Sequence, residues 1–162
     1  MTIPASARMF WDRYAASAGV PVADRYYDTF CFGDRQSLAD ELVALVLAGQ
    51  KRGTAGLYWA FEADGRSLPY PGALSVVTDW AGAPRCVVET TAVDVVPYDQ
   101  VSAEFAAIEG EGDLSLEFWR EAHWDYFGRE CARIGRLPAE DMPVVCHRFA
   151  LRYPAPGQHA QT

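Results

Sequence analysis

A lysine and a threonine three residues apart are the first side chains in this sequence that could carry chemistry. Lys51 and Thr54 stand in the segment 49–54, which reads Gly-Gln-Lys-Arg-Gly-Thr and contains two glycines that allow a tight turn. A threonine hydroxyl is a poor nucleophile until a base takes its proton, and a desolvated lysine can be that base. The residue order of a Walker phosphate-binding loop is absent. The spacing is compatible with a catalytic pair and also with a lysine exposed on a loop.

Lys51 has a second peculiarity in the composition. Lysine and arginine together number 14, and Lys51 is the only lysine among them. A lysine can give up its proton in apolar surroundings, whereas an arginine effectively cannot. The count therefore favours a task at position 51 that arginine could not perform, although a single leftover lysine at a chance position explains it as well.

Three carboxylates at alternate positions precede a predicted helix. Glu109, Glu111 and Asp113 are separated by single glycines. The run lacks the length and the ligand spacing of a calcium loop. Asp113 has a structural role as the expected cap of the following helix, so Glu109 and Glu111 are the residues that remain free for chemistry.

Histidine is the next candidate for acid–base chemistry. His123 lies four residues after Trp119 and four before Phe127, which predicts an inward position on a long helix. A lone histidine in that position is more often a hydrogen-bonded core residue than a base or a ligand. His147 falls in a predicted strand, and no G-x-S-x-G motif indicates a serine hydrolase.

The cysteines do not form a metal-binding pattern. No C-x-x-C pair is present, and the adjacent residues Cys146 and His147 should point to opposite faces of a strand. We therefore expect no metal and no cofactor. Free thiols in a reducing cytoplasm are expected at Cys31, Cys86, Cys131 and Cys146.

Length and composition favour one domain. The chain has 162 residues, of which 50% are hydrophobic, so it can bury a sizeable core without disulfides or metals. We expect a single domain over residues 1–153 and a flexible tail over 154–162. The apolar stretches are too short and too charged to span a bilayer, and the first residues do not read as a signal peptide. The sequence predicts a cytoplasmic protein without a membrane contact.

The formal net charge of −8 restricts the partners. Broad binding to a nucleic-acid backbone depends on an excess of lysine and arginine, so DNA is not an expected partner. A small nucleoside or nucleotide, or RNA held at a local site, remains compatible with the charge. The sequence does not distinguish a monomer from a homodimer.

The elements that must position these side chains are predicted by periodicity. Apolar residues at three- and four-residue steps indicate helices at both ends of the chain, with glycine and proline as stops. The predicted helices cover 4–17, a segment capped by Asp34 and closed by Gly49, a short segment from Ser102, and 114–134.

Between the helices, the period of the apolar residues changes to that of strands. Short apolar runs bounded by turn residues predict strands over 54–61, 73–80 and 85–96, and a closing strand over 143–153 follows the last helix. This order predicts an α+β protein with five to six mostly antiparallel strands, which we expect to close into a small β-barrel flanked by helices. A ligand should then lie at the mouth of the barrel or between barrel and helices.

Aromatic residues on or beside the first strand could contact such a ligand. Tyr58, Trp59 and Tyr70 follow Thr54, and one of these rings could stack on a nucleobase. Most aromatic rings in a chain of this size nevertheless belong to the core.

Taken together, these segments resemble the ASCH domain family, which is related to PUA-like RNA-binding barrels. The match covers roughly residues 8–153, and its strength lies in the order of several modest motifs. The motifs are Phe10-Trp11, Phe32-Gly33-Asp34, Gly49-x-Lys51-x-x-Thr54, Ala106-x-x-Glu109-Gly110-Glu111-Gly112-Asp113, Ser115-Leu116-x-x-Trp119-Arg120-x-x-His123 and Cys146-x-Arg148-Phe149.

The resemblance implies a PUA-like β-barrel with a cleft for RNA or a nucleoside. Some ASCH proteins are amidohydrolases that remove the acetyl group of N4-acetylcytidine, and by similarity Lys51 would be the base, Thr54 the nucleophile and Glu109 the acid or the orienting group. Another ASCH protein is a ribonuclease, and a non-catalytic RNA- or nucleotide-binding module is a further alternative. The chain departs from the compact amidohydrolases by its N-terminal helix, its longer 109–113 run and the long helix after it, which could change the substrate. Residues expected to bind the substrate are Arg52, Tyr58, Tyr70, Glu111, Arg120 and His123.

Overall fold

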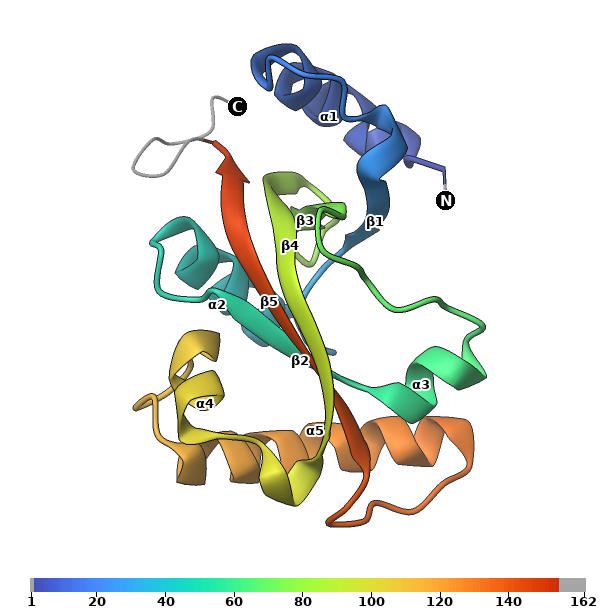
Figure 1. Ribbon diagram of the computed structural model, residues 1–162, viewed down its shortest axis with the longest axis vertical. Helices are drawn as coiled ribbons and strands as arrows, with labels where there is room; N and C mark the ends of the chain where they lie inside the picture. The colour runs from blue at the N-terminus through green and yellow to red at the C-terminus, as the bar shows by residue number, and fades with distance from the viewer. Residues whose placement is uncertain (1, 155–162) are drawn as a thin grey trace.

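A five-stranded sheet with the strand order β1-β3-β4-β5-β2 organises the protein (Figure 1). The structure is a computed structural model, and it describes residues 2–154. The strands are β1 (Tyr26–Phe30), β2 (Gly53–Leu57), β3 (Leu74–Thr78), β4 (Pro84–Pro97) and β5 (Pro143–Tyr153). The helices are α1 (Ala5–Ser17), α2 (Gln36–Leu47), α3 (Tyr58–Ala63), α4 (Ala103–Glu109) and α5 (Leu116–Ile134), with short 3-10 turns at Ala23–Arg25 and Tyr98–Gln100.

The predicted α+β class is confirmed, but the predicted closed barrel is not. Strands β3, β4, β5 and β2 pair antiparallel, and β1 pairs with β3 in parallel. Within residues 2–154, β1 and β2 pair with one neighbour each and remain the two edges of an open sheet. Both edge strands are five residues long, and β2 runs directly into helix α3.

Three apolar clusters attach the helices to this sheet. Helix α1 packs against β3 and β4 through Phe10 and Trp11, and helix α2 packs on the same strands and on β5 through Leu42 and Val46. Helices α4 and α5 form the largest cluster with the far ends of the sheet, centred on Phe127. Burial of these side chains away from water is the main favourable term that fixes each helix.

Several predicted boundaries differ from the observed ones. The strand predicted over 54–61 ends at Leu57, because a short apolar run followed by Ala60 and Glu62 suits a helix as well as a strand. The aromatic segment before residue 32 is not among the strands predicted above, but it forms β1. The predicted flexible tail, apart from Pro154, lies outside the described residues.

The two predicted helix caps are also wrong. Asp34 does not cap α2, whose N-cap is Arg35, and its carboxylate instead accepts a hydrogen bond from Arg129 Nε at 2.6 Å. Asp113 accepts from the backbone N–H of Ser115, and Ser115 is the residue that caps α5 by accepting from the N–H of Phe118. A serine two residues beyond an aspartate offers the same capping chemistry, so the sequence alone could not choose between them.

Gly110 brings the end of α4 onto the segment that precedes β2. It has a φ of +72°, and a Cβ at this position would lie 2.4 Å from the carbonyl oxygen of Gln50 and 3.0 Å from the Cα of Lys51. The two segments are joined by a hydrogen bond from the N–H of Arg52 to the carbonyl of Ile108 at 2.9 Å. Residues 109 and 111 are thereby placed beside Lys51. Among the described residues, no helix is long and apolar enough to cross a membrane.

This contact predicts that Gly110→Ala destabilises the protein more than Gly135→Ala does. Both glycines end a helix in the left-handed region, but a Cβ at Gly135 meets no atom within 4 Å. Gly135→Ala should cost about 1 kcal/mol for the backbone conformation alone, and Gly110→Ala should cost at least about twice as much. Urea denaturation of both variants measures the difference, and equal losses would contradict the proposed close approach.

Candidate functional site

The centre of the site is a buried lysine held by carboxylates. Lys51 is 2% exposed, and its Nζ lies 2.9 Å from Glu111 Oε2 and 3.7 Å from Glu109 Oε1. Nζ also donates a hydrogen bond to the backbone carbonyl of Glu109 at 3.3 Å. A buried ammonium is tolerated only where opposite charges and acceptors surround it, and these are supplied by the last residue of α4 and by the turn that follows it.

Glu109 extends the cluster from α4 to α5. Its Oε2 accepts a hydrogen bond from Trp119 Nε1 and lies 3.0 Å from His123 Nε2. The other ring nitrogen of His123, Nδ1, lies 2.8 Å from the carbonyl oxygen of Trp119 and must donate to it. Both nitrogens of His123 therefore face acceptors, which is the arrangement of an imidazolium paired with a carboxylate.

The charges in this cluster stabilise one another. Burial by itself would raise the pKa of Glu109, but the positive charges of His123 and Lys51 outweigh it and hold that pKa below the ordinary value. Burial would lower the pKa of His123, and the neighbouring Glu109 carboxylate outweighs it, so the pKa of His123 is raised. At neutral pH the cluster is best described as charged carboxylates balanced by an ammonium and a shared imidazole proton.

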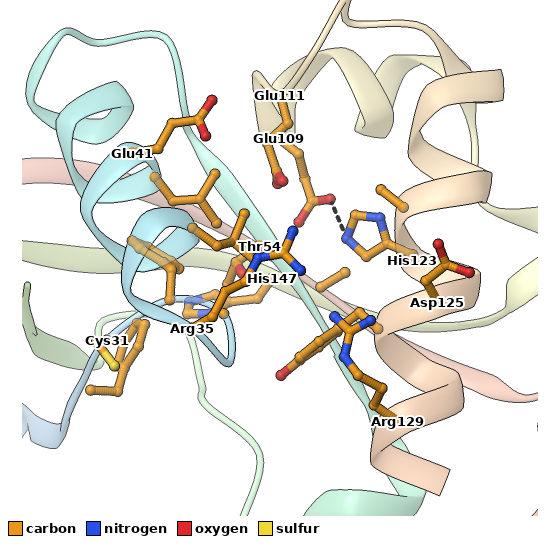
Figure 2. A pocket seen from close by; sticks show the side chains of 18 of the residues that line it. Cys31, Arg35, Glu41, Thr54, Glu109, Glu111, His123, Asp125, Arg129 and His147 are labelled. Carbon is orange, nitrogen blue, oxygen red and sulfur yellow. Dashed lines mark ion pairs between the residues drawn. The ribbon is translucent and has the colours of Figure 1, made fainter. Parts of the chain in front are cut away.

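A cavity of about 620 Å³ opens on one side of this cluster (Figure 2). It lies between the two sheet edges, with residues of β1 and β2 in its wall, and between helices α2 and α5. Phe32, Phe61 and Phe118 supply apolar surface. Its polar lining includes Arg35, Glu41, Thr54, Glu109, Glu111, His123, Asp125, Arg129 and His147.

The structure brings together part of the predicted site. Thr54, Glu109, Glu111 and His123 all line the cavity, although they come from three separate segments. Lys51 does not line it, because it is covered by the two glutamates that it binds. Its burial nevertheless places the amine, the hydroxyl and the carboxylates at one end of the fold.

The remaining predicted binding residues lie outside this cavity. Tyr58 begins α3 instead of continuing a strand, and Tyr70 is 45% exposed in the loop before β3. Arg52 and Arg120 are exposed, and neither belongs to the cavity wall. Arg52, Tyr58 and Tyr70 were expected because they lie near Thr54 in the sequence, and Arg120 because it belongs to the motif over residues 115–123. The turn into α3 and the position of Arg120 on α5 direct them elsewhere.

A second histidine, expected only as a strand residue, belongs to the cavity. His147 on β5 stands directly opposite Thr54 on β2, and both line the cavity. Its Nε2 lies 2.7 Å from the Thr90 hydroxyl on β4. Burial, aided by the charge of Lys51, lowers the pKa of His147 to about 4. Only the register between β2 and β5, which the sequence does not reveal, places it beside Thr54.

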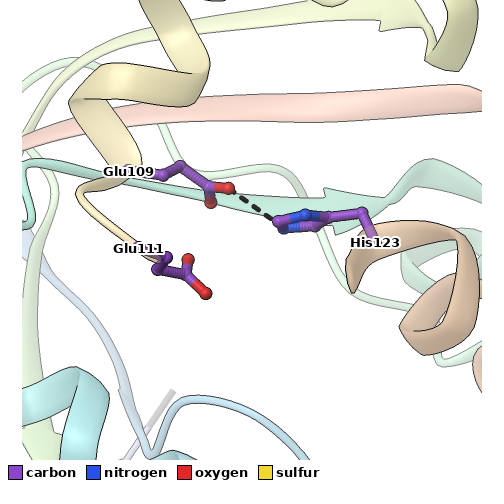
Figure 3. A group of neighbouring side chains, drawn as sticks. All are labelled: Glu109, Glu111 and His123. Carbon is purple, nitrogen blue, oxygen red and sulfur yellow. Dashed lines mark ion pairs between the residues drawn. The ribbon is translucent and has the colours of Figure 1, made fainter. Parts of the chain in front are cut away.

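Glu109, Glu111 and His123 are also the group best suited to hold a metal ion among the described residues (Figure 3). One ligand atom from each lies within 4.8 Å of the others. The Lys51 ammonium already places a positive charge against both carboxylates, and a divalent cation in the same space would be repelled by it. The absence of a metal requirement therefore stays a prediction.

The open α+β sheet with a charged cavity beside it defines a protein of the PUA-like fold. A model of the ASCH domain matches residues 28–153, and the chain belongs to the ASCH domain family.

Solved structures are similar over almost the whole chain. An ASCH domain from Lactobacillus crispatus is 36% identical with a TM-score of 0.87, over 94% of this chain and 98% of that one. A protein from Enterococcus faecalis is 25% identical with a TM-score of 0.82, over 97% and 98% of the two chains. An ASCH protein from Zymomonas mobilis, at 9% identity and a TM-score of 0.51 over 79% and 68%, is similar in fold alone. Among curated proteins, none is a significant match.

The buried cluster predicts a large loss of stability for Glu109→Gln. This change keeps the shape of the side chain but leaves Lys51 and His123 without their shared counter-charge. Removing one partner of a buried ion pair should cost about 3 kcal/mol. Glu104→Gln is the matched control, because it removes an exposed carboxylate from the same helix, paired with Arg148 at 3.0 Å, and should cost less than about 1 kcal/mol. Urea denaturation at neutral pH compares them, and equal losses would argue against a buried charged cluster.

The same cluster predicts a pH window of stability. Protonated His123 has a raised pKa, so its contribution is complete below its ordinary pKa of 6.5 and is lost as the pH rises through the folded value. Glu109 has a lowered pKa, so its contribution is present above 4.5 and is lost as the pH falls through the folded value. The free energy of unfolding of the wild type minus that of His123→Gln should therefore be greatest between these two values and should fall on the alkaline side. A difference that grows with pH above 6.5 would show that His123 is neutral in the folded protein.

Proposed function

We propose that this ASCH domain is a hydrolase that removes an acyl group from a small modified nucleoside, of which N4-acetylcytidine is the first to test. The observation that supports the proposal is that Thr54, Glu109 and Glu111 line one cavity and that the two glutamates hold the buried Lys51. A hydroxyl beside a charged, water-poor cluster is the arrangement that acyl transfer needs.

The cavity supports a small substrate. Its volume of about 620 Å³ lies in the range of sites that enclose a ligand of nucleoside size. The phenylalanine rings in its wall offer flat surface for a base, and Arg35 and Asp125 offer polar contacts near the rim. The net charge of −8 opposes the binding of long RNA, which favours a nucleoside over the ribonuclease alternative.

Thr54 is the proposed nucleophile, and Lys51 and Glu109 complete the catalytic group. Lys51 is paired with two carboxylates, so its proposed contribution is a fixed positive charge behind the cavity wall. Glu109 holds this charge and orients His123, and its Oε1 has no hydrogen-bond partner within the described part of the chain. That oxygen is buried and faces Lys51 Nζ at 3.7 Å, so Glu109 acts by holding the positive charge and not by direct contact with the substrate.

Acetate release from N4-acetylcytidine tests the proposal. The wild type should yield cytidine and acetate, and Thr54→Ala should reduce the rate by at least about a thousandfold if the hydroxyl forms the covalent intermediate. Thr91→Ala, which removes an exposed threonine on β4 that does not line the cavity, is the control and should retain the rate. Chromatography follows the products.

Other outcomes discriminate the alternatives. RNA shortened by the wild type and left intact by Thr54→Ala would favour a ribonuclease. Binding of a nucleoside that persists in Thr54→Ala, with no turnover by the wild type, would favour a non-catalytic binding module. Equal acetate release by the wild type and by Thr54→Ala would exclude Thr54 as the nucleophile.

A further inference from the structure

The proposed reaction leaves one role without a residue, because Thr54 needs a base. Lys51 is poorly placed for it. Its amine is held by Glu109 and Glu111, and it is separated from the cavity by these side chains. To accept the threonine proton, the ammonium would first have to lose its own proton against two buried carboxylates.

His123 is not available either. Its Nδ1 faces the carbonyl of Trp119 at 2.8 Å, and its Nε2 faces Glu109 at 3.0 Å. A histidine whose two ring nitrogens both donate to acceptors has no free lone pair. It therefore cannot take a proton from a neighbouring hydroxyl without breaking one of these interactions.

His147 meets the geometric requirement. It is the cross-strand partner of Thr54 in the antiparallel β2–β5 pair, and both residues line the cavity (Figure 2). Directly opposite residues of an antiparallel pair point to the same face, with their Cβ atoms roughly 4.5–5.5 Å apart. An imidazole and a hydroxyl on such neighbouring stems can reach hydrogen-bonding distance.

The surroundings of His147 leave one nitrogen free. Its Nε2 is engaged by the Thr90 hydroxyl at 2.7 Å, and its Nδ1 has no hydrogen-bond partner among the described residues. When Nε2 carries the proton and donates it to Thr90 Oγ1, the lone pair of Nδ1 is available. The burial of His147 and the charge of Lys51 lower its pKa to about 4, so this imidazole is neutral at pH 7.

We propose that His147 is the general base that activates Thr54, an inference that rests on the proposed function of Thr54 as nucleophile. Nδ1 of His147 takes the proton of Thr54 Oγ1 while that oxygen attacks the acyl carbonyl carbon. The bond from this carbon to the leaving nitrogen breaks, and His147 passes the proton to that nitrogen. Water then loses a proton to His147, attacks the threonine ester and releases the carboxylic acid, and Thr54 Oγ1 regains the proton.

In this mechanism Lys51 acts through His147. Its fixed charge disfavours the imidazolium, which keeps His147 neutral at pH 7 and favours the onward transfer of the proton to the leaving nitrogen. This dependence explains why a lysine that is not itself exposed to the cavity belongs to the site. It also gives a measurable consequence that does not require a substrate, because Lys51→Met should raise the pKa of His147, read from its ring proton resonances by NMR.

An activated ester separates this inference from the choice of substrate. p-Nitrophenyl acetate needs no recognition of a nucleoside, and the part of its hydrolysis that is lost in Thr54→Ala reports on Thr54 alone. This Thr54-dependent rate should fall by about a hundredfold or more in His147→Gln. Arg148→Gln is the matched control, since Arg148 is the next residue of β5, lies outside the cavity wall and should leave the rate unchanged.

Thermal unfolding shows whether His147→Gln is folded. If it is not, the pH profile of the wild-type rate still tests the proposal. In the wild type the charge that acts on His147 is that of Lys51, and the Thr54-dependent rate should be level from about pH 5 to about pH 8. A level profile, or a folded His147→Gln with the expected loss, supports His147 as base. A rate that keeps rising above about pH 8, as a lysine base requires, or an undiminished rate in folded His147→Gln, overturns it.

The two proposals fail in different ways. If N4-acetylcytidine is not hydrolysed but p-nitrophenyl acetate acylates Thr54 through His147, the substrate is wrong and the base assignment stands. If the nucleoside is hydrolysed and His147→Gln retains full activity while folded, the function stands and the base assignment is wrong. If the wild type shows no Thr54-dependent hydrolysis of the ester, both the nucleophile and its base are rejected.

Discussion

The rest of the site depends on one interaction, the pairing of the buried Lys51 ammonium with two carboxylates. Lys51 is almost fully removed from water, and an unpaired charge in that position would cost several kcal/mol, of order 3 to 5, so its partners are obligatory. The partners come from the turn that follows α4, about sixty residues later in the chain by sequence separation. Gly110 makes this turn possible, because its left-handed conformation and missing side chain let the turn lie against Lys51. The charge requirement therefore couples α4, α5 and the entry to β2 into one unit.

The open sheet is the second determinant of the site. A closed barrel of this size would be filled by side chains. Here β1 and β2 remain unpaired with one another, and the space beside their edges is the cavity. Helices α2 and α5 cover that space, which also protects the two edges from pairing with another chain. The long helix α5 thus forms a wall of the cavity and supplies His123 to it.

The secondary structure and the choice of Lys51 could largely be predicted, because both depend on features that are local in the sequence. The helical periodicity of 114–134 and the strand character of β3, β4 and β5 were visible in the sequence, and the rarity of lysine singled out residue 51. Pairing partners were not visible. Nothing in the sequence around residue 147 shows that it stands opposite Thr54, because register depends on how two distant strands meet. The same limit applies to β1, whose aromatic residues lack the alternation of a half-buried strand and whose five residues are all of intermediate burial.

The neighbouring charges shift the pKa values of the two histidines of the cavity in opposite directions. Both are buried, and burial alone would drive each toward the neutral form. His123 faces the Glu109 carboxylate and has a raised pKa, whereas His147 faces a hydroxyl and the charge of Lys51 and has a lowered one. Neighbouring groups whose pKa values are pushed apart in this way are suited to opposite tasks, one holding a proton and the other accepting one. Since Lys51 fixes the carboxylates beside His123 and also suppresses the charge on His147, the separation originates in the same buried amine.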